Sequence, residues 1–101
     1  MEKLSVIVPC FNEQETLQDY YDAISKVRET LLGKECELQV ILVDDGSKDK
    51  TLAKMKELSG QCSWIRYISF TRNFGKEAAI YAGLTHAEGE YVSLMDVDLQ
   101  D

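Results

Sequence analysis

The sequence predicts an α/β domain in which short parallel strands alternate with helices. Four runs rich in β-branched and apolar residues recur along the chain, each short enough for a single strand. Apolar residues at helical three-and-four spacing fill the first two intervals, and an alanine-rich segment fills the third. This alternation indicates parallel strands joined by crossover helices.

The four strands that we expect are Leu4–Val8, Leu38–Val43, Ile65–Phe70 and Tyr91–Met95. The second run, Leu-Gln-Val-Ile-Leu-Val, is nearly continuous in apolar character. Such a run is typical of a strand that is covered on both faces of a sheet.

The first expected helix spans Gln14–Leu31, and a capping box of Asn12 and Glu15 is expected at its start. Its predicted buried stripe comprises Leu17, Tyr20, Tyr21, Ile24, Val27 and Leu31.

The second expected helix spans Lys48–Leu58, with Ser47 as its N-cap. The third runs from about Gly75 to Glu88, and Gly89 is expected as its C-cap glycine. Together with the strands, these helices complete a β-α-β-α-β-α-β order.

Composition bounds the class of protein. The chain has 101 residues, which suffices for one small domain, and its net charge is −7. An acidic balance argues against a nucleic-acid binder, which neutralises phosphates with Lys and Arg. The three cysteines, Cys10, Cys36 and Cys62, are odd in number and lack a CxxC pair, so we expect free thiols in a reducing compartment. No run of apolar residues reaches the length of a membrane span, and we expect a cytoplasmic chain.

Polar residues follow the expected strands at their carboxyl ends, where ligands bind in open parallel sheets. The residues that gather there are Pro9, Phe11, Asn12, Glu13, Asp44, Asp45, Gly46, Ser47, Thr71, Arg72, Asn73, Lys76, Asp96, Asp98, Gln100 and Asp101.

Asp96 and Asp98 are two positions apart, so both carboxylates point to one side if the chain is extended there. Two convergent carboxylates repel each other unless a cation or proton lies between them. Mg²⁺ and Mn²⁺ take such oxygen ligands, and Gln100 could add a carbonyl oxygen. The same residues also suit a solvated strand end that caps a turn.

The polar residues that follow the second and the third expected strands allow two interpretations each. Asp44 and Asp45 could accept hydrogen bonds from a nucleobase, although Asp-Asp-Gly-Ser is also an ordinary strand-to-helix turn. Arg72, Asn73 and Lys76 flank the start of the third helix, which favours an anion site. They are equally compatible with plain surface charge.

Taken in order, these motifs resemble the start of a family 2 glycosyltransferase of the GT-A fold. The resemblance rests on Ser5-Val-Ile-Val-Pro-Cys-Phe-Asn-Glu13, Val43-Asp-Asp-Gly-Ser47 and Asp96-Val-Asp98. Phe70-Thr-Arg-Asn-Phe-Gly-Lys-Glu-Ala-Ala79 and the ending Asp-Leu-Gln-Asp101 narrow it to the polyprenyl-phosphate hexosyltransferases. Val97 stands where that group often has Ala. Residues 1–101 would then form the Rossmann-like, nucleotide-binding N-terminal portion of a truncated GT-A domain.

The resemblance implies a role for each matched position. Residues for the nucleotide sugar would be Pro9, Phe11, Asn12, Glu13, Asp44, Asp45 and Asp96. Metal ligands for Mg²⁺ or Mn²⁺ would be Asp96, Asp98 and Gln100, and the phosphate or acceptor side would have Arg72, Asn73 and Lys76. No catalytic residue is assigned within these positions.

The implied activity is inverting transfer of a hexose from a UDP- or GDP-sugar, with a polyprenyl phosphate as acceptor. We expect the chain by itself to bind the donor without turnover, and an exposed sheet edge to pair with another copy. The longer protein would be membrane-associated in the cell envelope, with this domain on the cytoplasmic side. The alternative is a non-catalytic βα module, such as a receiver-like signalling domain. Its usual acidic positions are occupied here by Asn12-Glu13 and Thr71-Arg72.

Overall fold

The computed structural model of the chain describes residues 1–98. Strands and helices alternate in the predicted order. The elements are β1 (Glu2–Cys10), α1 (Leu17–Gly33), β2 (Cys36–Asp44), α2 (Thr51–Gln61), β3 (Ile65–Ser69), α3 (Lys76–His86) and β4 (Tyr91–Leu94).

The described strands form one sheet in the order β3-β2-β1-β4, and every neighbouring pair is parallel. At the centre of the register, Val6 of β1 pairs with Val40 of β2 on one side and with Ser93 of β4 on the other. The predicted parallel α/β sheet is therefore confirmed. Because the strands run in one direction, the loops that follow them emerge at a common edge.

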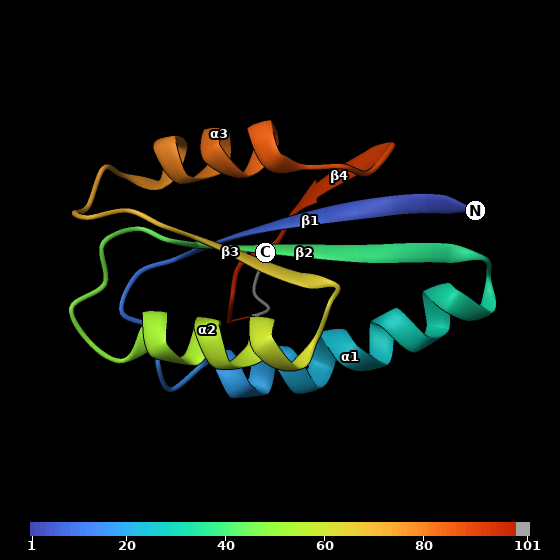
Figure 1. The fold of residues 1–101 in the computed structure, drawn as a ribbon, viewed down its shortest axis with the longest axis horizontal. Helices are drawn as coiled ribbons and strands as arrows, with labels where there is room; N and C mark the ends of the chain where they lie inside the picture. Colours follow the sequence, from blue (N-terminus) through green and yellow to red (C-terminus); the bar gives the residue numbers. More distant parts are fainter. Residues whose placement is uncertain (99–101) are drawn as a thin grey trace.

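Helices cover both faces of this sheet. Helices α1 and α2 pack on one face and α3 packs on the other (Figure 1). Alternate residues of β1 divide between two hydrophobic clusters, with Val6 and Val8 beneath α1 and α2 and Ile7 beneath α3. In β2 every residue from Leu38 to Asp44 is buried, which confirms the prediction from its apolar run.

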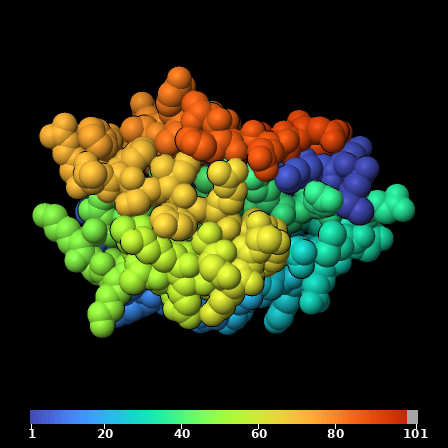
Figure 2. Space-filling model, in the orientation of Figure 1, coloured from blue at the N-terminus to red at the C-terminus, as the bar shows by residue number. Residues whose placement is uncertain are grey.

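The edge formed by β4 is the least covered part of the described sheet. All four of its residues are exposed, in contrast to the buried strands β1 and β2. Figure 2 shows α3 and β4 together along one side of the molecule. Their large exposed apolar side chains are Tyr81, Leu84, Tyr91, Val92 and Leu94. Among residues 1–98, no helix is long and apolar enough to cross a bilayer.

The expected start of the first helix is wrong, because the Asn12 side chain hydrogen-bonds to the loop after β2 instead of capping the helix. Helix α1 begins at Leu17 with Thr16 at its N-cap, and no side chain caps it. Asn12 has a left-handed backbone (φ 53°), and its side-chain oxygen accepts a hydrogen bond from the Lys48 N–H at 2.9 Å. The predicted stripe also fails at Val27, which is 45% exposed.

The expected caps of the other two helices are also wrong. Helix α2 begins at Thr51 rather than Lys48, and the Ser47 hydroxyl accepts the Asn12 N–H at 2.9 Å instead of capping the helix. Helix α3 ends at His86. The Gly89 N–H donates to the Ser5 hydroxyl at 2.8 Å, so this glycine lets the chain pass close to β1.

Candidate functional site

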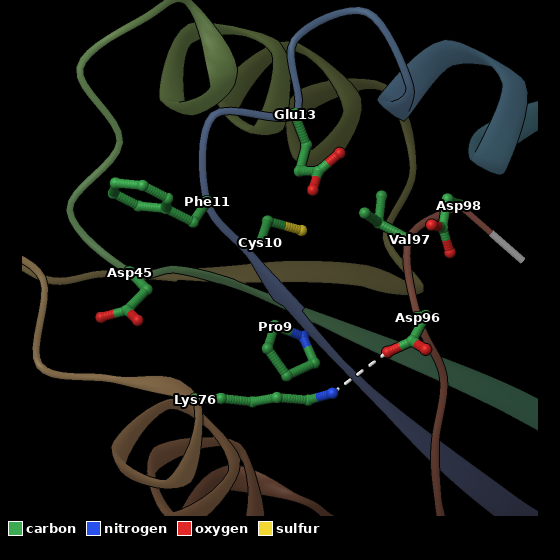
Figure 3. A pocket seen from close by; sticks show the side chains of 9 residues that line it. All are labelled: Pro9, Cys10, Phe11, Glu13, Asp45, Lys76, Asp96, Val97 and Asp98. Atoms are coloured by element: carbon green, nitrogen blue, oxygen red, sulfur yellow. Dashed lines mark hydrogen bonds and ion pairs between the residues drawn. The ribbon is translucent and has the colours of Figure 1, made fainter. Parts of the chain in front are cut away.

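A cavity of about 220 Å³ lies at the carboxyl edge of the sheet (Figure 3). The last two residues of β1, residues that follow β1, β2 and β4, and the start of α3 form its walls. The lining residues are Pro9, Cys10, Phe11, Glu13, Asp45, Lys76, Asp96, Val97 and Asp98. Side chains up to 89 positions apart in the chain thus meet where the sequence predicted a site.

Asp45 belongs to the cavity wall and also fixes the loop before α3. Its side chain is 5% exposed in the position that follows β2. One carboxylate oxygen accepts the Phe74 N–H at 2.8 Å, and the other accepts the Gly75 N–H at 3.1 Å. These bonds place Lys76, the next residue, at the mouth of the cavity.

Asp44 is turned away from the cavity lining and holds the turn after β2. It is 2% exposed, and its carboxylate accepts the Ser47 N–H at 2.9 Å and the Ser69 hydroxyl at 3.4 Å. The two adjacent carboxylates therefore hold different parts of the backbone.

Asn12 also lies outside the cavity lining. Its backbone and side chain join the loop after β1 to the loop after β2, through Ser47 and Lys48. The next residue, Glu13, donates its N–H to the Thr51 hydroxyl at 2.8 Å, and its carboxylate accepts the Thr16 hydroxyl at 2.9 Å. These hydrogen bonds fix the wall that Glu13 contributes to the cavity.

Of the three polar residues flanking α3, only Lys76 lines the cavity. Its ammonium lies 3.4 Å from an Asp96 carboxylate oxygen. Arg72 and Asn73 are exposed, and the Arg72 guanidinium lies over the Phe74 ring, 4.8 Å from its centroid. Among the described residues of the predicted anion site, Lys76 is therefore the one cationic side chain at the cavity.

Asp96 and Asp98 both line the cavity, but not as neighbours along a strand. Strand β4 ends at Leu94, and Val97 and Asp98 form a turn, so the predicted alternation of an extended chain does not apply. Val97 is buried and joins the cluster beneath α1 and α2. Gln100, the third expected ligand, lies outside the described residues.

The carboxylates at the cavity fit a hard divalent cation whose remaining ligands come from a substrate and from water. Within residues 1–98, no group of three or more His, Cys, Asp or Glu is arranged to hold a metal, so Asp96 and Asp98 would supply two ligands at most. Asp96 and Asp98 offer carboxylate oxygens only, and Mg²⁺ commonly binds one or two carboxylates and completes its shell with water and phosphate.

Sequence reasoning missed two lining residues, Cys10 and Val97. The Cys10 thiol is 2% exposed and donates to the Val8 carbonyl at 3.4 Å. Burial, and then the nearby Glu13 and Asp44 carboxylates, raise the pKa of this thiol far above its usual range. A protonated thiol is a poor nucleophile, so these surroundings argue against a nucleophilic role for Cys10.

Comparison with known proteins gives concordant matches. The family model described as glycosyl transferase family 2 matches residues 5–101. The bactoprenol glucosyl transferase of Shigella phage SfV is 42% identical over 98% of this chain and 31% of its own length. A prophage bactoprenol glucosyl transferase homolog of Escherichia coli K12 is 41% identical over the same shares. The chain therefore spans about a third of the length of these relatives.

Two solved structures share the fold. The mannosyltransferase PcManGT from Pyrobaculum calidifontis, in complex with GDP-Man and Mn²⁺, superposes with a TM-score of 0.80 at 27% identity. That match covers 96% of this chain and 28% of the other. TarS 1-349 of S. aureus, in complex with UDP, gives 0.77 at 27% identity, covering 95% and 27%.

Proposed function

The chain belongs to glycosyl transferase family 2, and from this membership we propose that its cavity binds the nucleotide part of a nucleotide-sugar donor. One observation carries the proposal. The loops after β1, β2 and β4 and the start of α3 bring carboxylates and one ammonium around a single cavity at the carboxyl edge of the sheet. Similar folds have been solved with GDP-Man and with UDP, which supports a donor of this class.

We assign direct donor contact to the residues that line the cavity. Pro9, Phe11 and Glu13 form one wall, and Asp45 is the carboxylate nearest to the loop before α3. Asn12, Asp44, Arg72 and Asn73 lie outside the lining. Asn12 and Asp44 would act by fixing the loops that carry the contact residues.

The proposed cofactor is Mg²⁺ or Mn²⁺, held by Asp96 and Asp98. A similar fold was solved with Mn²⁺ together with its nucleotide sugar. When bound, such a cation stabilises negative charge on a diphosphate leaving group as a Lewis acid. The two carboxylates of this chain would orient it toward the diphosphate.

For the longer protein we propose inverting hexose transfer to a polyprenyl phosphate, on the basis of the relatives named as bactoprenol glucosyl transferases. The bond from the sugar to the diphosphate breaks, and a phosphate oxygen of the acceptor attacks from the opposite face. A phosphate monoester has its second pKa at about 6, so the acceptor is already an anion near neutrality and needs little help from a base.

Because this chain spans only 31% of the length of the SfV relative, we propose that it is the donor-binding portion of a longer GT-A domain. We propose that the longer protein is membrane-associated with this portion on the cytoplasmic side, and that this chain binds the donor without turnover. The exposed β4 edge would pair with a second copy when the chain is alone. Family membership argues against the receiver-like alternative.

The test is calorimetric titration of the chain with UDP and with GDP, each with and without Mn²⁺. We expect one nucleotide to bind in a metal-dependent way, and Asp98→Asn to weaken that binding by about tenfold or more, since even changes behind a metal ligand cost about 10- to 100-fold. Asp22→Asn removes the same charge from the exposed face of α1 and should leave binding unchanged. Metal-independent binding, or equal loss in both variants, would contradict the proposal.

A further inference from the structure

Lys76 and Asp96 face each other across the cavity mouth. Their ammonium and carboxylate are 3.4 Å apart, and the two side chains come from the start of α3 and from the segment after β4 (Figure 3). Both are partly in solvent, with side-chain exposures of 66% and 42%. The pair can therefore open without disturbing the core.

The pair places one carboxylate in two roles. Asp96 is a proposed ligand of the divalent cation, and the ammonium of Lys76 already neutralises it. A cation bound at Asp96 would lie within a few ångströms of that ammonium, and like charges at such a distance repel. Lys76 and the metal are therefore competitors for Asp96.

The position of Lys76 favours a second partner. It is the first residue of α3, where the helix dipole is positive and disfavours a lysine but favours an anion. A diphosphate in the cavity would supply that anion, and a lysine on its flexible stem can swing to a phosphate oxygen.

We propose that Lys76 is an exchangeable counter-ion that couples metal and nucleotide binding. In the structure its ammonium pairs with Asp96. When a nucleotide diphosphate enters with a divalent cation, Asp96 passes to the cation and Lys76 passes to the phosphate. The inference rests on the proposed donor site and adds a prediction that the donor site alone does not make: loss of Lys76 affects the two ligands in opposite directions.

The experiment measures Mn²⁺ binding without nucleotide by electron paramagnetic resonance, and UDP and GDP binding at saturating Mn²⁺ by calorimetry. For Lys76→Gln we expect Mn²⁺ affinity to rise by about two- to fivefold, the range for losing an exposed ion pair. The affinity for the nucleotide that binds should fall by about tenfold or more, since a charge-assisted hydrogen bond is lost.

Lys3→Gln is the matched control. It removes the same charge from an ion pair of similar length, Lys3 with Glu88 at 3.3 Å. Lys3 lies six residues from Pro9 along β1, about 20 Å away and well beyond the screening length at physiological salt. We expect both affinities to be unchanged in this variant.

A double-mutant cycle isolates the pair. With Asp96→Asn in place, adding Lys76→Gln should no longer raise Mn²⁺ affinity, because the Asp96 carboxylate for which Lys76 and Mn²⁺ compete has been removed. An unchanged or lower Mn²⁺ affinity in Lys76→Gln alone, or the same rise with and without Asp96, would overturn the exchange. If Asp98→Asn still weakens metal-dependent nucleotide binding by about tenfold or more, the proposed donor site stands and only the exchange fails. If neither nucleotide binds the unaltered chain, the donor site fails as well.

Discussion

Replacing Gly46 with alanine should destabilise the chain at the edge of the candidate site. Gly46 follows Asp45 and has a left-handed backbone with φ 75°. A Cβ at this position would lie 2.3 Å from the Arg72 carbonyl carbon and 2.4 Å from the Asn73 nitrogen. Both contacts are with backbone, which cannot rotate away as a side chain can.

Two effects lower the free energy of unfolding in Gly46→Ala. A left-handed backbone costs a non-glycine residue about 1–2 kcal/mol. Relieving the overlap requires moving the loop that Asp45 holds through Phe74 and Gly75, and overpacking of this kind costs about 1–3 kcal/mol. The sum, about 2–5 kcal/mol, is a large part of the roughly 5–15 kcal/mol that stabilises a native domain.

Urea unfolding followed by circular dichroism measures the loss. Gly60→Ala is the matched control, because Gly60 lies in α2 and nothing is within 4 Å of the added Cβ. Alanine in a helix should there raise the free energy of unfolding by about 0.5 kcal/mol. If Gly46→Ala changes stability by less than about 0.5 kcal/mol while Gly60→Ala behaves as expected, the close approach of the two loops is refuted.

Two further predictions concern titrating side chains. Because burial and nearby carboxylates raise the pKa of the Cys10 thiol, iodoacetamide at about pH 8 should modify the half-buried Cys36 and Cys62 first, as mass spectrometry would detect. Unfolding in urea should abolish this difference in reactivity. Early modification of Cys10 in the folded chain would contradict its burial. Slight burial raises the pKa of Asp49, but hydrogen bonds from Thr51 and from the Gln14 N–H outweigh it and lower that pKa below its usual value. A carboxylate whose pKa is lower in the folded state stabilises the fold at pH values above its unfolded pKa, and this stabilisation is lost as the pH falls through the folded pKa. The destabilisation caused by Asp49→Asn should therefore be clear at about pH 7 and shrink toward about pH 3. A destabilisation that does not change with pH would show that the carboxylate charge has no part.

Local sequence patterns were sufficient for the strands. The apolar run from Leu38 to Val43 predicted a strand covered on both faces, because side chains at successive positions point to opposite sides and all of these are apolar or buried. The same patterns predicted that the site would lie at the carboxyl edge of the sheet, since parallel strands share one such edge.

Helix starts were not predictable in this way, because the capping side chains had partners far away in sequence. Asn12 and Ser47 have the chemistry of N-caps, but their hydrogen bonds join the loops after β1 and β2 across 35 positions. Once β1 and β2 pair, those two loops are adjacent, and the polar side chains satisfy each other's backbone.

The sequence by itself determined the alternation of strands and helices, the family and the set of polar residues near the site, because each depends on residue type and local spacing. Only the tertiary structure decided which of those residues face the cavity. Asp44 and Asp45 are adjacent and identical in chemistry, yet one is fixed to Ser47 within its own turn and the other to the loop before α3. Likewise, Lys76 reaches Asp96 because α3 packs on β1 and β4 pairs with β1. Such contacts arise from packing between distant segments, which no local pattern encodes.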